Sequence, residues 1–178
     1  MWSGPSVRGG AVAGALAGMV MAVFMMVYMA ASGQSVWTNP NLIAVMWMGR
    51  AVAGGGFGWP TIVGFATHMA ASVAMGVVGL AFIAALPPRR TLLAAFAYAL
   101  ASYPLVVSVV MTWANPLFVQ RTMILPMTMA HAVFGVVYGA SYIRFAERQS
   151  EPPPLKSQNR RAAFQPAPGV CRQADPGA

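Results

Sequence analysis

Hydrophobic positions fall into long runs that charged residues hardly interrupt. Between Gly9 and Ile143 the chain has no carboxylate, and its only charged residues are Arg50, Arg89, Arg90 and Arg121. The runs between them cover residues 9–49, 51–88, 91–120 and 122–143. A helix that crosses the hydrocarbon core needs about 20 predominantly apolar residues. The pattern therefore predicts an all-α integral membrane protein, with four transmembrane helices in an antiparallel bundle.

Glycine and proline positions indicate where these helices begin and end. We expect them to cover residues 10–31, 60–86, 91–112 and 122–144. The second begins at Pro60, because proline is tolerated in a first turn, and Pro104 predicts a kink inside the third. A cleaved signal peptide is the competing interpretation of the first helix. Its apolar run exceeds 20 residues, whereas signal peptides have apolar cores of about 7–15 residues, so we expect it to be retained.

The segments outside the four helices predict two further elements. Asn39-Pro40 is typical of a helix start, and the apolar segment that follows is too short to cross a membrane. We therefore expect a short interfacial helix over residues 40–52, in the first outer loop. Residues 146–178 are rich in proline, glutamine, arginine and alanine. We expect a transmembrane domain over residues 1–145, followed by a disordered, basic, proline-rich cytoplasmic tail over residues 146–178.

Charge predicts the orientation and the surroundings of the bundle. The chain is 58% hydrophobic and 8% charged, with a net charge of +8. If both termini lie inside, nine basic residues are on the inner side and only Arg50 and Arg121 on the outer. The positive-inside rule then predicts a multi-pass protein of the bacterial cytoplasmic (inner) membrane, with both termini in the cytoplasm. The basic residues form no face on a soluble module, so we expect contact with the lipid bilayer and no nucleic acid.

The two histidines of the chain both lie inside predicted spans. His68 is in the second span and His131 in the fourth, and each lies about 12–14 Å below the outer end of its helix at 1.5 Å per residue. Ionisable residues inside a span are costly and suggest a function. Hydroxyl groups at similar depth predict a polar cluster around the histidines, made of Tyr28, Ser72, Ser108, Thr112 and Thr128.

Glycines recur at helical spacing on three of the spans. They are Gly10, Gly14 and Gly18 on the first, Gly76 on the second, and Gly135 and Gly139 on the fourth. We expect these positions to serve helix packing, although a flat cofactor could also approach the backbone there. The second and fourth spans also share the sequence Gly-Val-Val, which is compatible with an ancient duplication of one hairpin.

Three interpretations of the histidines remain open. They stabilise the bundle by hydrogen bonds of about 0.6–2 kcal/mol each, or they are the axial ligands of a haem b. In the third interpretation the two histidines bind copper, because imidazole and thioether ligands suit Cu(I). Met127 stands one turn before His131, and three further methionines form a ladder at Met21, Met25 and Met29. Methionine is also a flexible apolar filler, so the first expectation is that no cofactor is bound.

Enzyme chemistry finds little support in this chain. Ser141 and His131 lie on the same predicted helix about 15 Å apart, too far for a Ser-His dyad. We expect a non-enzymatic membrane protein that acts through helix–helix association with itself or with a membrane partner. The alternatives are a haem b- or copper-binding redox protein that uses His68 and His131, and an oligomeric channel or transporter for small solutes.

Four features carry a resemblance to known proteins. They are the glycine- and methionine-rich first span, the segment from Asn39 to Ala44, Thr67-His68 and the segment from Ala130 to Gly135. Together they resemble an uncharacterised family of small four-helix bacterial inner-membrane proteins. The resemblance covers about residues 10–145. It implies a membrane-embedded bundle and assigns no catalytic residue.

Overall fold

The computed structural model describes residues 6–150, and all regular elements in this range are helical. Four helices are long and apolar enough to cross a membrane, over Val7–Ala31, Trp59–Ile83, Pro88–Ala114 and Ile124–Gln149. The predicted all-α class and the four long apolar helices are thus confirmed. Most of the predicted tail, residues 151–178, lies outside the described residues.

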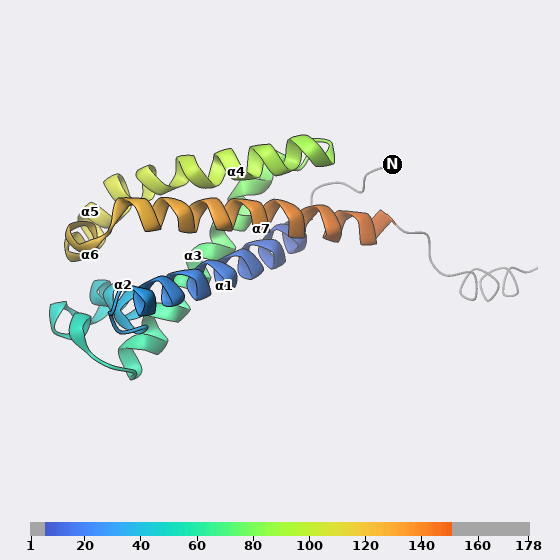
Figure 1. Cartoon of the computed structure of the whole chain (residues 1–178). Coiled ribbons are helices and arrows are strands. Elements are labelled where there is room, and N and C mark those ends of the chain that lie inside the picture. The colour runs from blue at the N-terminus through green and yellow to red at the C-terminus, as the bar shows by residue number, and fades with distance from the viewer. Residues whose placement is uncertain (1–5, 151–178) are drawn as a thin grey trace, which may run out of the picture.

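The order of elements is shown in Figure 1. They are α1 (Val7–Ala31), α2 (Thr38–Met48), the 3-10 helix η1 (Arg50–Gly54), α3 (Trp59–Ile83), α4 (Pro88–Leu105), the π-helix η2 (Val106–Met111), α5 (Thr112–Ala114), α6 (Pro116–Arg121) and α7 (Ile124–Ser150).

Local interactions explain several ends that differ from the predicted spans. The Ser6 hydroxyl accepts a hydrogen bond from the backbone N–H of Gly9, so α1 begins earlier than predicted. The short helix α6 is absent from the predicted elements. Its N-cap is Asn115, which accepts from a backbone N–H, and Pro116 occupies its first position. The last helix begins after α6 and continues to Ser150, beyond the predicted end at residue 144.

The kink predicted at Pro104 takes the form of a π-helical segment. Proline has no N–H, and its ring crowds the carbonyl of the residue four positions earlier. The α-helix α4 ends one residue after Pro104, at Leu105, and the wider η2 follows from Val106. Single turns of π-helix inside α-helices occur frequently at functional sites, and η2 contributes to the cavity described in the next subsection.

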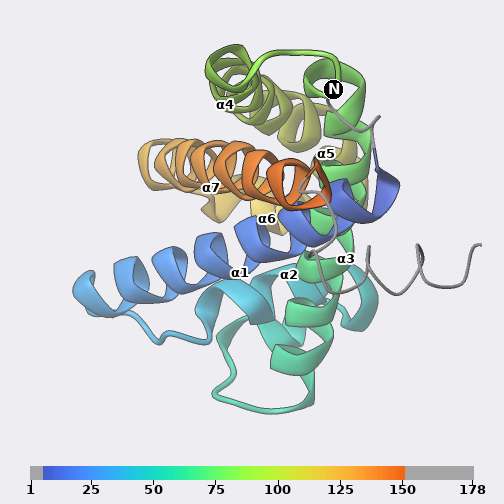
Figure 2. The ribbon, with the colours of Figure 1, turned by 90° about the vertical axis from the view of Figure 1, so that its right-hand side faces the viewer.

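The long helices form two hairpins that pack against each other. The first hairpin joins α1 to α3 and the second joins α4 to α7, and α1 also packs along α7. As a result α7 lies between α4 and α1 (Figure 2). The start of α1, the α3–α4 turn and the end of α7 lie at one end of the molecule. α2 and α6 contact each other at the opposite end, named here the α2–α6 end (Figure 1).

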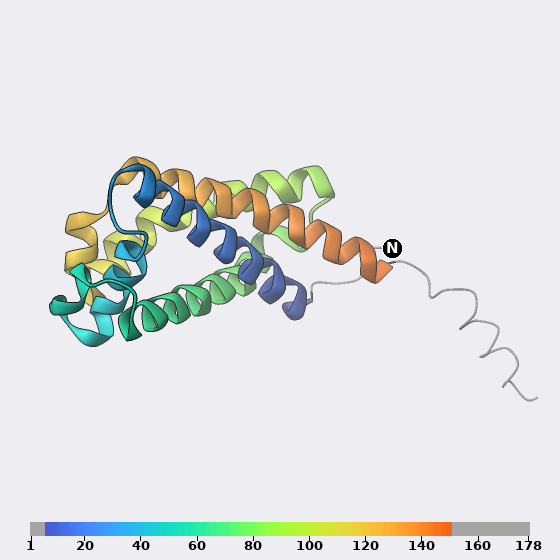
Figure 3. The same ribbon diagram turned by 60° about the horizontal axis from the view of Figure 1, so that its bottom comes forward.

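Glycine permits the closest approach inside the first hairpin. A Cβ on Gly14 would lie 2.5 Å from the Ser72 carbonyl oxygen and 2.8 Å from the Gly76 Cα, so a larger residue does not fit without a backbone shift. Gly10 and Gly18 extend the same contact. α1 and α3 cross here and diverge toward the α2–α6 end (Figure 3).

The second hairpin uses glycine opposite alanine. A Cβ on Gly135 would lie 2.8 Å from the Phe96 Cα, and one on Gly139 would lie 3.0 Å from the Ala95 Cβ. The predicted packing glycines thus face helices of the same chain. In this structure the space beside them is occupied by a neighbouring helix.

Candidate functional site

A cavity of about 120 Å³ opens where α1 and α3 diverge. It lies between the two hairpins, and α1, α2, α3, η2, α6 and α7 all contribute to its wall. Both histidines line it, together with six methionines: Met21, Met25, Met26, Met75, Met111 and Met127. The two histidines predicted at matching depth therefore share one cavity, and its wall is mainly apolar.

His68 is anchored to the neighbouring helix of its own hairpin. Its Nε2 lies 2.9 Å from the carbonyl oxygen of Gly18 in α1. A carbonyl can only accept, so Nε2 carries the proton and Nδ1 keeps its lone pair. The Ser72 hydroxyl, one turn further along α3, donates to the His68 carbonyl oxygen at 2.8 Å. The glycine contact between α1 and α3 thus positions the ring.

His131 is anchored within its own helix. Its Nδ1 lies 2.9 Å from the Met127 carbonyl oxygen, so Nδ1–H donates and Nε2 keeps its lone pair. The ring also packs against Tyr103 of α4, with the ring centroids 5.0 Å apart. Among the described residues, no fully buried side-chain nitrogen or oxygen lacks a hydrogen-bond partner. His68 Nδ1 and His131 Nε2 take part in neither of these hydrogen bonds, so neither nitrogen is fully buried.

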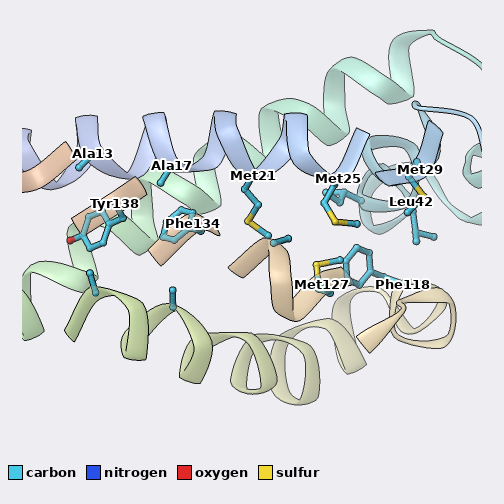
Figure 4. Close-up of a cluster of buried hydrophobic side chains, with 14 of the residues drawn as sticks. Ala13, Ala17, Met21, Met25, Met29, Leu42, Phe118, Met127, Phe134 and Tyr138 are labelled. Carbon is cyan, nitrogen blue, oxygen red and sulfur yellow. The ribbon is translucent and has the colours of Figure 1, made fainter. Parts of the chain in front are cut away.

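Methionines from opposite sides approach the same space. Met21 and Met25 project from α1 toward Met127 and Phe118 (Figure 4). All four side chains belong to the buried core. The third residue of the predicted ladder, Met29, lies beside α2 and is not part of the cavity wall. Two of the three ladder positions therefore line the same cavity as the histidines.

The polar cluster predicted around the histidines does not form as one group. Ser72 lines the cavity, but Ser108 and Thr112 are exposed. Thr112 and Thr128 donate to carbonyl oxygens of preceding turns at 3.2 and 2.8 Å, and the Tyr28 hydroxyl lies 3.5 Å from a methionine sulfur. Helical hydroxyls often bond to the preceding turn in this way. Equal depth along different helices was therefore not sufficient to bring these hydroxyls together.

A buried asparagine stabilises the connection between α2 and α3 through hydrogen bonds. Asn41 Nδ2 donates to the carbonyl oxygens of Gly55 and Gly56 at 2.7 and 3.1 Å, and its Oδ1 accepts from the Thr61 hydroxyl at 2.7 Å. The residues of α2 from Pro40 to Val45 are buried. The helix predicted as interfacial thus packs into the protein and forms part of the cavity wall.

A second buried asparagine joins the two hairpins at the α2–α6 end. Asn115 Nδ2 donates to the Leu42 carbonyl oxygen in α2 at 2.7 Å, while its Oδ1 caps α6. Close packing of α2 also depends on Gly64 of α3, where a Cβ would overlap the Pro40 carbonyl oxygen. The sequence interpretation did not include Asn115 or Gly64.

A repeated sequence pattern could have revealed this end of the molecule. Trp-x-Asn-Pro occurs at residues 37–40 and again at 113–116, next to the starts of α2 and α6. Each copy precedes a long helix in which a histidine is followed by small residues four and eight positions later. These are His68, Ser72 and Gly76 in α3, and His131, Gly135 and Gly139 in α7. This register differs by one turn from the Gly-Val-Val alignment and supports a duplicated hairpin.

Searches of protein-family models, curated proteins and solved structures found no match to this chain. The resemblance to small bacterial inner-membrane proteins therefore stays a prediction. The function has to be argued from the cavity and its residues.

Proposed function

We propose that this chain is a multi-pass protein of the bacterial cytoplasmic membrane with four crossings and both termini in the cytoplasm. Its four long apolar helices support this proposal. Arg8, Arg144 and the α3–α4 turn with Arg89 and Arg90 belong to one end of the molecule, whereas Arg50 and Arg121 belong to the α2–α6 end (Figure 1). The positive-inside rule favours a cytoplasmic position for the first end.

Labelling of single cysteines tests this orientation. Gly54 is exposed, with open space around its Cα. In a Cys171→Ser background, Gly54→Cys should react with a membrane-impermeant maleimide on intact spheroplasts. The native Cys171 should react only after the membrane is broken. If Cys171 reacts on intact spheroplasts and Gly54→Cys does not, the orientation is the reverse of the proposed one.

Within the membrane, we propose that the protein is a non-enzymatic binding protein for one small guest in its cavity. The observation that carries this proposal is that His68 and His131 line the same cavity, each with one ring nitrogen fixed by a backbone carbonyl and the other free. A mainly apolar cavity with a few convergent polar groups is typical of small-ligand sites. In transporters built from repeats, such sites lie at the interface of the repeats, as this cavity does.

The size of the cavity favours a guest smaller than a haem. An engineered protein cavity of about 150 Å³ holds one benzene molecule, and this cavity measures about 120 Å³. A macrocycle of four pyrrole rings would require the helices to separate. A haem b would reveal itself by a Soret band that both histidine substitutions remove.

Helix–helix association is the second proposed function, supported by the exposed apolar side chains of the third span, Pro88–Ala114. Leu93 and Trp113 of this third span are 70% and 88% exposed. The packing glycines of the other spans face the same chain and are not available to a second copy. Lipid tails cover such a surface as well as a partner helix does, so the cavity supports ligand binding more specifically than this surface supports association.

Filling the cavity tests the binding proposal. Ala22 of α1 lines the cavity, and Ala81 of α3 is exposed on the outside. Xenon enters apolar cavities of this size. In protein labelled with ¹³C at the methionine methyl groups, xenon pressure should shift the signals of the cavity methionines in the wild type and in Ala81→Phe. Ala22→Phe should suppress these shifts while the helical content stays unchanged. Equal shifts in Ala22→Phe would contradict the proposal.

A further inference from the structure

We infer that the guest of this cavity is Cu(I), bound by the free ring nitrogens of His68 and His131 and by the sulfur of Met127. This inference rests on the proposed function, because it names the occupant of the same cavity. It is carried by the donor atoms, by the orientation of the two rings and by the absence of charge in the wall.

The available donor atoms are soft. Within residues 6–150 there is no group of three or more His, Cys, Asp and Glu side chains that could hold a metal ion. The cavity instead combines two imidazoles with six thioethers. Carboxylate oxygens suit hard cations such as Mg²⁺ and Ca²⁺, whereas thioethers select Cu(I) and imidazole also suits copper.

The histidine rings already have the arrangement of metal ligands. A ligating histidine almost always donates its other ring N–H to a carbonyl, a carboxylate or water, which fixes the tautomer and the ring orientation. His68 donates through Nε2 to Gly18, and His131 donates through Nδ1 to Met127, both at 2.9 Å. Each ring lines the cavity and keeps one unprotonated nitrogen that is not used by its hydrogen bond to a carbonyl.

Met127 is the methionine of α7 that lines the cavity, on the same helix as His131. It stands one turn before His131, it lines the cavity, and its own carbonyl accepts the His131 hydrogen bond. Met21 and Met25 project toward it from α1 (Figure 4). The methionine side chain has three rotatable bonds, so its sulfur can close on an ion while the backbone stays in place.

The charge of the wall favours a monovalent ion. All of the proposed donors are neutral, and the lining residues include no carboxylate. The cost of moving an ion from water into apolar surroundings rises with the square of its charge in the Born description. A divalent ion would thus meet about four times the penalty of Cu(I), without a carboxylate to offset it.

Competitive titration tests the inference. Cu(I) is titrated anaerobically into the detergent-purified full-length protein against bicinchoninate, in a Cys171→Ser background, because the thiol of Cys171 could bind Cu(I) by itself. One Cu(I) per chain is expected, and His68→Ala, His131→Ala and Met127→Leu should each weaken binding at least tenfold. Met19→Leu, an exposed position on α1, is the matched control and should leave binding unchanged.

Two further measurements show whether weaker Cu(I) binding comes from the loss of a ligand or from unfolding of the variant. Met127→Leu conserves side-chain volume and should keep the wild-type melting temperature. Copper X-ray absorption should show nitrogen and sulfur neighbours in the wild type and fewer sulfur neighbours in Met127→Leu. Cu(I) binding that is unchanged in both His131→Ala and Met127→Leu would overturn the inference.

The xenon experiment shows whether a negative copper result overturns only the choice of Cu(I) as the guest or also the proposed binding function. If xenon reaches the cavity methionines and Cu(I) does not bind, the identity of the guest is overturned while the binding cavity stands. If neither xenon nor Cu(I) reaches them, both the inference and the proposed function are overturned.

Discussion

The two hairpins hold their histidines in different ways. In the first hairpin, His68 donates to Gly18, which belongs to the opposite helix. In the second, His131 donates to Met127 of its own helix. Both hydrogen bonds fix a tautomer, but only the first also joins two helices. The comparison teaches that two histidines can line the same cavity while the hydrogen bond of only one of them joins two helices.

The two hairpins also differ in how closely their helices approach each other at equivalent glycines. A Cβ on Gly76 would overlap the Gly10 carbonyl oxygen and lie 2.7 Å from the Gly14 Cα, so it would meet backbone. A Cβ on Gly139 would lie 3.0 Å from the Ala95 Cβ, 3.1 Å from the Leu92 Cδ1 and 3.2 Å from the Leu92 Cα, so its closest contacts would be side chains. At this pair of positions the first hairpin is therefore the more sensitive to added volume. Gly135 of the second hairpin also packs against backbone, since a Cβ there would lie 2.8 Å from the Phe96 Cα.

The largest expected effect comes from alanine at these two equivalent glycines. Gly76→Ala should destabilise the protein by about 2–3 kcal/mol, because the backbones of α1 and α3 must separate. Gly139→Ala should be close to neutral, since a small side-chain shift is offset by a gain of up to about 1 kcal/mol in helix propensity. Thermal unfolding in detergent, followed by circular dichroism, compares the two. Equal destabilisation would contradict the proposed difference between the hairpins.

The next effect concerns the asparagines at the α2–α6 end. Asn115→Ala removes the cap of α6 and the hydrogen bond to Leu42, and should cost about 2 kcal/mol. Because Leu42 belongs to the other hairpin, hydrogen exchange should accelerate in α2 as well as in α6. Asn41→Ala is the internal comparison. Its partners are Gly55, Gly56 and Thr61, so it should accelerate exchange in that connection and leave α6 protected. An unchanged α2 in Asn115→Ala would exclude the link between hairpins.

The sequence predicted properties that depend on position along one helix. Runs without charge predicted the helical class and the four long helices, and both are confirmed. The distance of His68 and His131 from their helix ends predicted a matching depth, and the two residues share a cavity. Contacts between helices also depend on rotation about each axis. For this reason Ser108 and Thr112 were wrongly grouped with the histidines, and Asn115, which acts through a helix far away in sequence, was missed.

The smallest expected effect is a difference in stability between the variants His68→Ala and His131→Ala. His68→Ala should lower the stability by about 0.6–1 kcal/mol, the usual range for a hydrogen bond between membrane helices. His131→Ala should lower it less, because the Met127 carbonyl can keep its helical hydrogen bond and the contact that is lost to another helix is the ring contact with Tyr103. Melting temperatures of the metal-free proteins measure this difference. Cu(I) affinity should fall in both variants, since both rings are ligands in the inferred site. A similar loss of stability in the two variants would mean that the ring contact between His131 and Tyr103 stabilises the packing of α7 on α4 as much as the Gly18 hydrogen bond stabilises that of α3 on α1. The contrast between the hairpins would then rest on their glycines alone.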